Sequence, residues 1–249
     1  MVTEHTFEDQ DLSGARFRMV SLRGARMHAV DLAGVKITDA WAVGVDISGM
    51  LRDVRLNGVD VVPLVEAELD RIHPQRAKMR PVDADGYREA WAILEQLWAA
   101  TIARARGLDA TLLHERVDGE WSFVETLRHL NFGTAAWALR AVLGEPAPWH
   151  PTDLPHDEMP ELPGLPRDRR IQPSLDEVLA VRAGRVARVR ELLAGLTDEQ
   201  LRSSTTPVTE PGYPEPESFA VTRCLGAVIN EHWEHRLYAE RDLDVLTGR

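Results

Sequence analysis

Two different spacings of apolar residues divide the chain. From residue 7 to about residue 62, a large apolar side chain stands at nearly every fifth position, and a small or β-branched residue precedes most of them by two. The series comprises Phe7, Leu12, Phe17, Leu22, Met27, Leu32, Ile37 and Ile47, with Ala42 in the one gap. A period of five fits neither an amphipathic helix nor a half-buried strand. The pattern therefore predicts a repeat architecture over residues 1–62.

From residue 63 onward the apolar positions follow helical spacing. They predict helices over residues 64–72, 87–106, 122–143, 174–193 and 219–246, with a short one from residue 197. Ser122 with Glu125, and Ser174 with Glu177, have the spacing of capping boxes, which mark helix starts. The proline-rich residues 145–173 predict a long crossover, and residues 203–217 predict a second loop. Four long helices with one extended crossover are typical of a four-helix bundle.

The last predicted helix carries the residues that point most directly to chemistry. Glu231 and His235 are four residues apart, so both side chains project from one helix face. His129, on the second long helix, is the candidate third ligand. One carboxylate and two imidazoles can hold a divalent metal and leave a coordination position open. His232 is an alternative ligand to Glu231, because residues three apart also share a helix face. The non-functional alternative is that Glu231 and His235 form an ordinary surface pair and that His129 is a core histidine.

Composition narrows the function classes. The formal net charge of −11 argues against a nucleic-acid binder, which needs a basic surface to displace counterions. The single cysteine, Cys224, excludes an internal disulfide and an all-cysteine zinc site. No basic start followed by an apolar stretch suggests a signal peptide, and no apolar run has the length of a membrane span. These features predict a cytoplasmic protein that binds neither nucleic acid nor membrane.

The three candidate ligands resemble the motif of the DinB-like (DinB/YfiT) four-helix superfamily. Its members carry a His on the second helix and a His-x-x-x-His or Glu-x-x-x-His pair on the last, which His129, Glu231 and His235 match. The Glu version is similar to the metal-binding domain of mycothiol-dependent maleylpyruvate isomerase, although no C-terminal domain follows here. The resemblance covers about residues 83–246. The expected fold is mainly α, a DinB-like four-helix bundle.

The resemblance implies a chemistry as well as a fold. The metal is expected to be zinc, with nickel as the alternative, and to activate a low-molecular-weight thiol of the mycothiol type for attack on an electrophilic substrate. The protein would then be a thiol S-transferase or isomerase. Glu231 would serve as ligand and as a catalytic acceptor for the thiol proton. A metal-dependent hydrolase on the same site is the alternative enzyme.

Further residues are candidates for binding the co-substrate. Arg236 follows the last His, as it often does in the superfamily, and suits either an anionic ligand or a pairing with Glu240. Trp137, two turns after His129, suits either a pocket wall or the core. The crossover segments Trp149-His150-Pro151 and His156-Asp157-Glu158 suit either a lid over the site or a surface loop. Cys224 shares a helix face with Glu231 but fits a small buried core residue.

The N-terminal period of five resembles the pentapeptide-repeat pattern, whose family structure is a short right-handed β-helix of square section. A solenoid this short needs a cap. The expected domains are a pentapeptide-repeat-like β-helix at 1–62, a linker helix at 63–82 and the bundle at 83–249. Residues 1–62 carry nine acidic and seven basic side chains, so a net charge of −2 makes a poor mimic of DNA. A structural or homodimerising role is expected, and a non-catalytic protein that docks a partner through this module is the alternative from another class.

Overall fold

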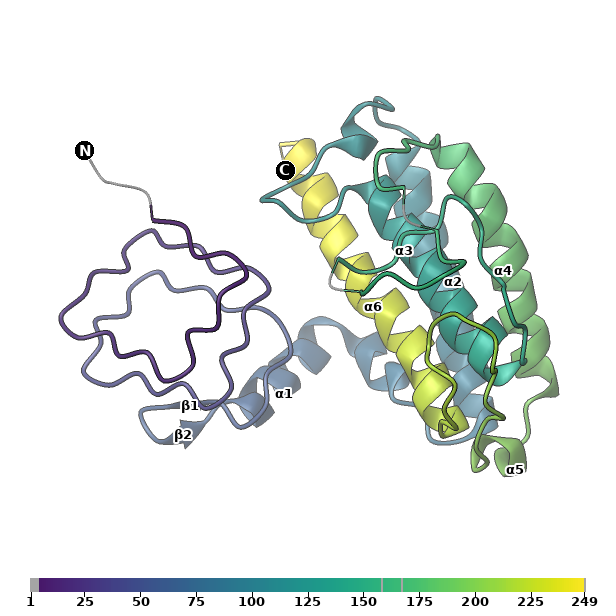
Figure 1. Ribbon diagram of the computed structural model, residues 1–249, viewed down its shortest axis with the longest axis horizontal. Coiled ribbons are helices and arrows are strands. Elements are labelled where there is room, and N and C mark those ends of the chain that lie inside the picture. Colours follow the sequence, from purple (N-terminus) through teal and green to yellow (C-terminus); the bar gives the residue numbers. More distant parts are fainter. Residues whose placement is uncertain (1–4, 158, 167, 249) are drawn as a thin grey trace. The chain divides into compact units, whose positions relative to one another are not determined.

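The computed structural model describes residues 5–157, 159–166 and 168–248, and it divides the chain into two compact units, residues 1–51 and 52–249. The second unit is mainly helical (Figure 1). Its helices are α1 (Val62–Ile72), η1 (Pro74–Met79), α2 (Ala84–Ala105), η2 (Leu112–His114), α3 (Phe123–Thr134), η3 (Ala135–Val142), α4 (Leu175–Gly195), α5 (Asp198–Leu201) and α6 (Val221–Leu246). Within the described ranges, none of them is both long and apolar enough to cross a membrane.

The backbone of the first unit repeats every ten residues. Gly14, Gly24 and Gly34 have positive φ angles of 77°, 74° and 73°. The Ala15 N–H donates to the Leu12 carbonyl at 2.9 Å, and equivalent bonds follow ten and twenty residues later. Figure 1 shows this segment winding in successive, nearly square turns. Residues 5–51 contain no assigned strand, so the expected β-helix is not shown. The structure does show a backbone that repeats every ten residues, which is two five-residue repeats.

Apolar side chains of the first unit stay partly open to solvent. Leu12 is 43% exposed and Phe7 63%, and Trp41, outside the five-residue series, is 93% exposed. Over residues 5–51 no side chain is fully buried. The short repeat thus presents apolar surface rather than enclosing a core.

The second unit begins with a small hairpin. Strands β1 (Arg55–Leu56) and β2 (Val59–Asp60) pair antiparallel, and they are the only assigned strands in the described ranges. Asn57 and Gly58 connect them with φ angles of 49° and 82°. This left-handed pair is the type I′ turn that an Asn-Gly sequence favours, because its twist matches that of the two strands.

Four long helical segments form the bundle. Helix α2 packs against α4 and α6, and α3 with its continuation η3 packs against the same two helices. Apolar side chains from these helices meet in two neighbouring core clusters, one around Trp91 and Trp233 and the other around Trp98 and Leu127. The predicted long helices are all present. The main difference is that residues 135–142, predicted as ordinary helix, have π-helical hydrogen bonding.

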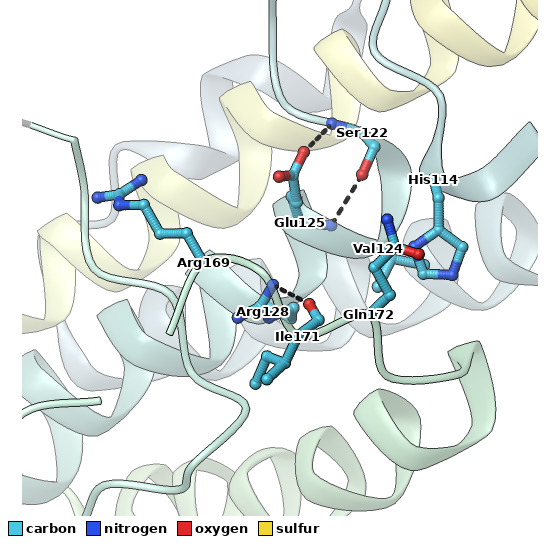
Figure 2. A pocket seen from close by; sticks show the side chains of 8 residues that line it. All are labelled: His114, Ser122, Val124, Glu125, Arg128, Arg169, Ile171 and Gln172. Carbon is cyan, nitrogen blue, oxygen red and sulfur yellow. Dashed lines mark hydrogen bonds between the residues drawn. The ribbon is translucent and has the colours of Figure 1, made fainter. Parts of the chain in front are cut away.

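Side-chain caps explain where the helices begin. The Ser122 hydroxyl accepts a bond from the Glu125 N–H at 3.3 Å, and the Glu125 carboxylate accepts one from the Ser122 N–H at 2.9 Å (Figure 2). Ser174 and Glu177 repeat the arrangement before α4. Helix α2 begins at Ala84, earlier than predicted, because Asp83 caps it by accepting from the Gly86 N–H at 2.7 Å.

A buried arginine fastens the crossover of residues 145–173 to α3. Arg128 donates to the carbonyl oxygens of Thr152, Asp168 and Ile171 at 2.7, 3.2 and 3.1 Å. Figure 2 shows Arg128 reaching the Ile171 carbonyl beside a small cavity. That cavity, about 40 Å³, has room for water but not for a substrate. Arg128 therefore ties three described residues of the crossover to α3.

A second arginine does the same for the loop at residues 203–217. Arg140, on η3, is 1% exposed. It donates to the carbonyls of Val208, Glu210 and Pro214, and also to that of Pro146 in the crossover. A single guanidinium thereby joins both long loops to the end of the same helix.

Candidate metal centre

Three side chains with metal-binding atoms converge between α3 and α6. His129 projects from α3, and Glu231 and His235 project from one face of α6. The ligand atoms that they offer all lie within 4.8 Å of one another. Glu231 Oε2 is 3.0 Å from His235 Nε2 and 3.4 Å from His129 Nε2. The structure thus brings together the three residues that the spacing singled out.

The donor set fits a divalent cation. Two imidazole nitrogens and one carboxylate oxygen form a common three-residue zinc set, which leaves a further position for a substrate. Metal–ligand bonds of about 2.0–2.1 Å in a tetrahedron separate neighbouring donors by roughly 3.3 Å. The observed separations of 3.0 and 3.4 Å bracket that value. The cluster is therefore compatible with a divalent metal.

A backbone carbonyl orients the His129 ring. His129 Nδ1 lies 3.1 Å from the carbonyl oxygen of Leu154. Since a carbonyl only accepts, Nδ1 carries a proton, and Nε2 is the nitrogen that faces Glu231. This second contact is the one that metal-binding histidines usually make, and it fixes both the tautomer and the ring. Leu154 was not singled out from the sequence.

The crossover holds that carbonyl in place from two sides. The Leu154 N–H donates to the Arg128 carbonyl on α3 at 3.3 Å. The neighbouring Asp153 forms a buried, two-pronged ion pair with Arg185 of α4 at 2.7 and 2.8 Å. Asp153 also accepts from the His150 N–H at 2.9 Å. The acceptor for His129 is thus positioned by contacts to two different helices.

Glu231 is held in its ionised form. Burial by itself would raise its pKa, but the hydrogen bonds and charges of His129 and His235 outweigh that effect and hold the pKa of Glu231 well below its usual range. A carboxylate that stays charged is suited to bind a cation rather than to act as an acid at neutral pH.

Aromatic rings line the ligand cluster. The ring of Trp121 stacks on His235, with centroids 5.9 Å apart and an interplanar angle of 19°. The same ring lies tilted on His129 at 4.4 Å. Tyr238, one turn past His235 on α6, meets His235 edge-on at 6.0 Å. Trp121 stands directly before the cap Ser122, and that position beside a predicted helix start is the one sequence signal that could have found it.

Trp137 belongs to an adjoining aromatic group. It meets Tyr213 edge-on at 5.8 Å and Phe219 at 5.5 Å. Burial raises the pKa of Tyr213, and the negative charge of Glu231 raises it further. Tyr213, in the loop at residues 203–217, was not singled out from the sequence either.

Only part of the crossover segment that was considered as a lid packs against the aromatic residues near the cluster. His156 lies edge-on to Tyr213 at 6.0 Å, and Trp149 stacks on Phe132 of α3 at 5.2 Å. His150 is exposed, and Glu158 lies outside the described residues. Part of the segment therefore covers the aromatic group next to the cluster.

Arg236 points elsewhere. Its side chain is buried, pairs with Glu240 at 2.7 Å and lies over the ring of Trp233. Successive residues of a helix are about 100° apart, so the residue after His235 faces away from the site. Of the two roles expected for Arg236, binding an anionic ligand or pairing with Glu240, the structure shows the pairing.

Two further residues of α6 are buried in the bundle. His232 places Nε2 3.0 Å from the Thr134 hydroxyl and Nδ1 3.3 Å from the Arg182 guanidinium, so neither nitrogen is available to the cluster. Cys224 is fully buried, and burial raises its pKa to about 11. It is a core residue, not a reactive thiol.

Comparison with known proteins gives one match. A family model described as the DinB superfamily matches residues 93–239, a range that contains all three clustered ligands. No curated protein and no solved structure matches the chain.

Proposed function

The chain belongs to the DinB superfamily, and on that premise we propose that it is a divalent-metal-dependent enzyme that uses a low-molecular-weight thiol as co-substrate. The observation that carries the proposal is the His129–Glu231–His235 cluster, with its oriented imidazole and its ionised carboxylate. Two imidazoles and one carboxylate that converge on one point are a donor set for a divalent cation. Metal dependence is therefore the first part of the proposal.

Zinc is the proposed metal, with nickel second. Imidazole and carboxylate ligands suit both ions. When bound, such a cation lowers the pKa of a thiol or water at its open position and polarises a carbonyl. His129, Glu231 and His235 would hold it, and Leu154 would keep the His129 lone pair directed inward.

The thiol-dependent reaction rests on the likeness of the Glu-x-x-x-His pair to the mycothiol-dependent isomerase motif. In the proposed transfer, the thiol S–H bond breaks and its proton passes to a base, and the thiolate sulfur bonds to an electrophilic carbon of the substrate as a π bond or a leaving-group bond at that carbon breaks. Because its pKa is low, the Glu231 carboxylate is a weak base and would hold that proton only briefly. Its role is therefore proposed as a ligand first and as a transient proton acceptor second.

The aromatic surroundings suggest the kind of substrate. Trp121 and Tyr238 bring aromatic rings close to the cluster, and Tyr213 and Trp137 form an adjoining aromatic group. An electrophile with a flat apolar part fits such walls. A hydrolase with water as the nucleophile is the alternative for the same cluster.

The N-terminal unit is proposed to be a short pentapeptide-repeat-type module. The support is the five-residue apolar series together with the ten-residue backbone repeat at Gly14, Gly24 and Gly34. Its half-open apolar side chains, Phe7 and Leu12 among them, favour a role in homodimerisation or in docking a protein partner. A chain starting at residue 63 that remains active and has the same oligomeric state as the full-length protein would rule out homodimerisation.

The test of the enzyme proposal is metal content and thiol-dependent turnover of the full-length protein. We expect about one zinc or nickel ion per chain by mass spectrometry, lost in His129→Ala, Glu231→Ala and His235→Ala. His150→Ala, an exposed histidine outside the cluster, is the control that should keep the ion. Products are then compared with and without added thiol. Protein that remains metal-free after titration with zinc and nickel would overturn the proposal, whereas turnover without thiol would favour the hydrolase.

A further inference from the structure

A cavity of about 280 Å³ lies between α2 and α4, and no clustered ligand lines it. Its apolar lining includes Trp91, Trp98, Ile102, Leu179 and Val186. Because α2 and α4 pack on each other and α3 and α6 do the same, this groove and the groove with the metal cluster occupy different sides of the bundle. The volume is near the lower end of small-molecule sites, about 300 Å³, so it suits one small ring compound.

A buried cation that forms no direct ion pair in the described residues lines this cavity; the charge of Glu95 acts on it, but Glu95 is already paired with Arg190. Arg182, on α4, is 7% exposed. In the described part of the chain its one hydrogen bond runs from Nη2 to the neutral ring of His232 at 3.3 Å, and its guanidinium lies 4.9 Å from the centre of the Trp98 ring. Burial lowers the pKa of Arg182 to about 10, so it still carries its charge at neutral pH. Buried charges are ordinarily paired.

Three other buried arginines of the bundle are satisfied by the protein itself, whereas Arg236 pairs with Glu240 and its buried Nε has no hydrogen bond in the described residues. Arg185 has the two oxygens of Asp153, while Arg128 and Arg140 each donate to several backbone carbonyls. These three therefore have a structural role that their contacts explain. Arg182 has four further N–H donors in its fork and no such explanation.

His232 cannot supply what Arg182 lacks. The Thr134 hydroxyl already donates to the Leu130 carbonyl at 2.7 Å, so it accepts from His232 Nε2–H. His232 Nδ1 is then the acceptor for Arg182, and the ring is neutral.

Two more polar atoms of lining residues lack a partner. In the described ranges neither Trp91 Nε1 nor Glu95 Oε1 has a hydrogen bond, although both atoms are buried. The other oxygen of Glu95 pairs with Arg190 at 2.8 Å. The charged side chains of the lining are thus Arg182, Arg190 and Glu95, which leaves one positive charge in excess.

We propose that this cavity binds a small aromatic monocarboxylate, whose ring packs against Trp91 and Trp98 and whose carboxylate accepts hydrogen bonds from Arg182. A guanidinium matches a carboxylate with two parallel bonds, and the aromatic walls match a ring. The carboxylate of Glu95 selects against a second negative charge on the ligand. This site is separate from the proposed metal-dependent reaction.

The test is calorimetric titration of the full-length, metal-loaded protein with benzoate. Benzamide, of the same shape but neutral, and phthalate, with two charges, are the comparison ligands. Arg182→Met removes the charge and keeps much of the volume, and Arg188→Met on the same helix is the matched control, because Arg188 is exposed and pairs with Glu145. Ala183→Phe fills the cavity from an exposed position without touching the arginine.

Benzoate should bind the wild type and Arg188→Met, and its affinity should fall on the order of tenfold or more in Arg182→Met. Ala183→Phe should abolish binding, and benzamide and phthalate should bind more weakly than benzoate. Arg182→Met should stay folded with an unchanged or higher Tm, because it removes an unpaired buried charge. Equal benzoate affinity in Arg182→Met, no binding to the wild type, or binding lost in His129→Ala but kept in Ala183→Phe would each overturn the proposal, the last by placing benzoate at the metal cluster.

Discussion

His129 Nδ1 lies 3.1 Å from the carbonyl oxygen of Leu154, so a loop residue sets the tautomer of a helix residue. This bond links the candidate metal cluster to the crossover of residues 145–173. The adjacent Asp153–Arg185 ion pair and the Arg128 anchor hold the crossover in turn. Any change that moves the crossover should therefore change the metal centre too.

The first prediction concerns Asp153. Asp153→Ala leaves Arg185 as a buried, unpaired cation, which should lower the free energy of unfolding by about 3–5 kcal/mol. It should also weaken metal binding by roughly 10- to 100-fold, because the Leu154 carbonyl loses its support. Thermal melting and competitive metal titration measure the two effects. Asp157→Ala, which removes an exposed ion pair with Arg169, is the control and should change both quantities little.

The second prediction concerns Gly212. A Cβ added here would lie 2.9 Å from Arg140 Cζ, so Gly212→Ala must displace the guanidinium that holds both loops. We expect a loss of about 1–3 kcal/mol in the free energy of unfolding by chemical denaturation. The same substitution at Gly184 meets nothing within 4 Å and lies in the middle of exposed helix, so it should stabilise by roughly 0.5–1 kcal/mol. Identical effects at the two positions would contradict the role given to Arg140.

The third prediction concerns the pH dependence of the cap at α3. Burial opposes ionisation of Glu125, but Arg116 and the Ser122 N–H outweigh it and lower its pKa in the folded protein. Its stabilising contribution is therefore complete above the unfolded pKa of about 4.3 and is lost as pH falls through the lower folded value. Glu125→Gln should cost about 1 kcal/mol at pH 7. The difference from the wild type should shrink towards pH 3, as denaturant unfolding across that range would measure, and a constant difference would refute the linkage.

The fourth prediction concerns Cys224. With a pKa raised to about 11 by burial, only about one thiol in a thousand is ionised at pH 8. An alkylating reagent should leave Cys224 unmodified in the native protein and label it fully in denaturant, as mass spectrometry of the intact chain would show. Rapid labelling of the native protein at pH 8 would mean that the core around Phe219 opens readily.

Local spacing was enough to predict the helical part of the fold. Capping boxes at Ser122 and Ser174 and apolar residues at helical intervals depend on neighbours within one or two turns, which the sequence states directly. The pairing of Glu231 with His235 is local for the same reason. The five-residue apolar series likewise indicates a repeat by its spacing alone, although the strands expected of that repeat are not shown.

The surroundings of the cluster were decided by tertiary structure alone. Trp121, Leu154 and Tyr213 come from a helix start and two loops, and the two loops are held by arginines that bind backbone carbonyls. Every residue offers such a carbonyl, so no sequence pattern marks the ones used. The side to which Arg236 and Arg182 turn also depends on which helices pack together. The sequence by itself determined the helical elements and the paired ligands on α6. Contacts between distant segments decided the orientation of His129, the aromatic walls and the surroundings of Arg182, because long-range packing leaves no periodic pattern along the chain.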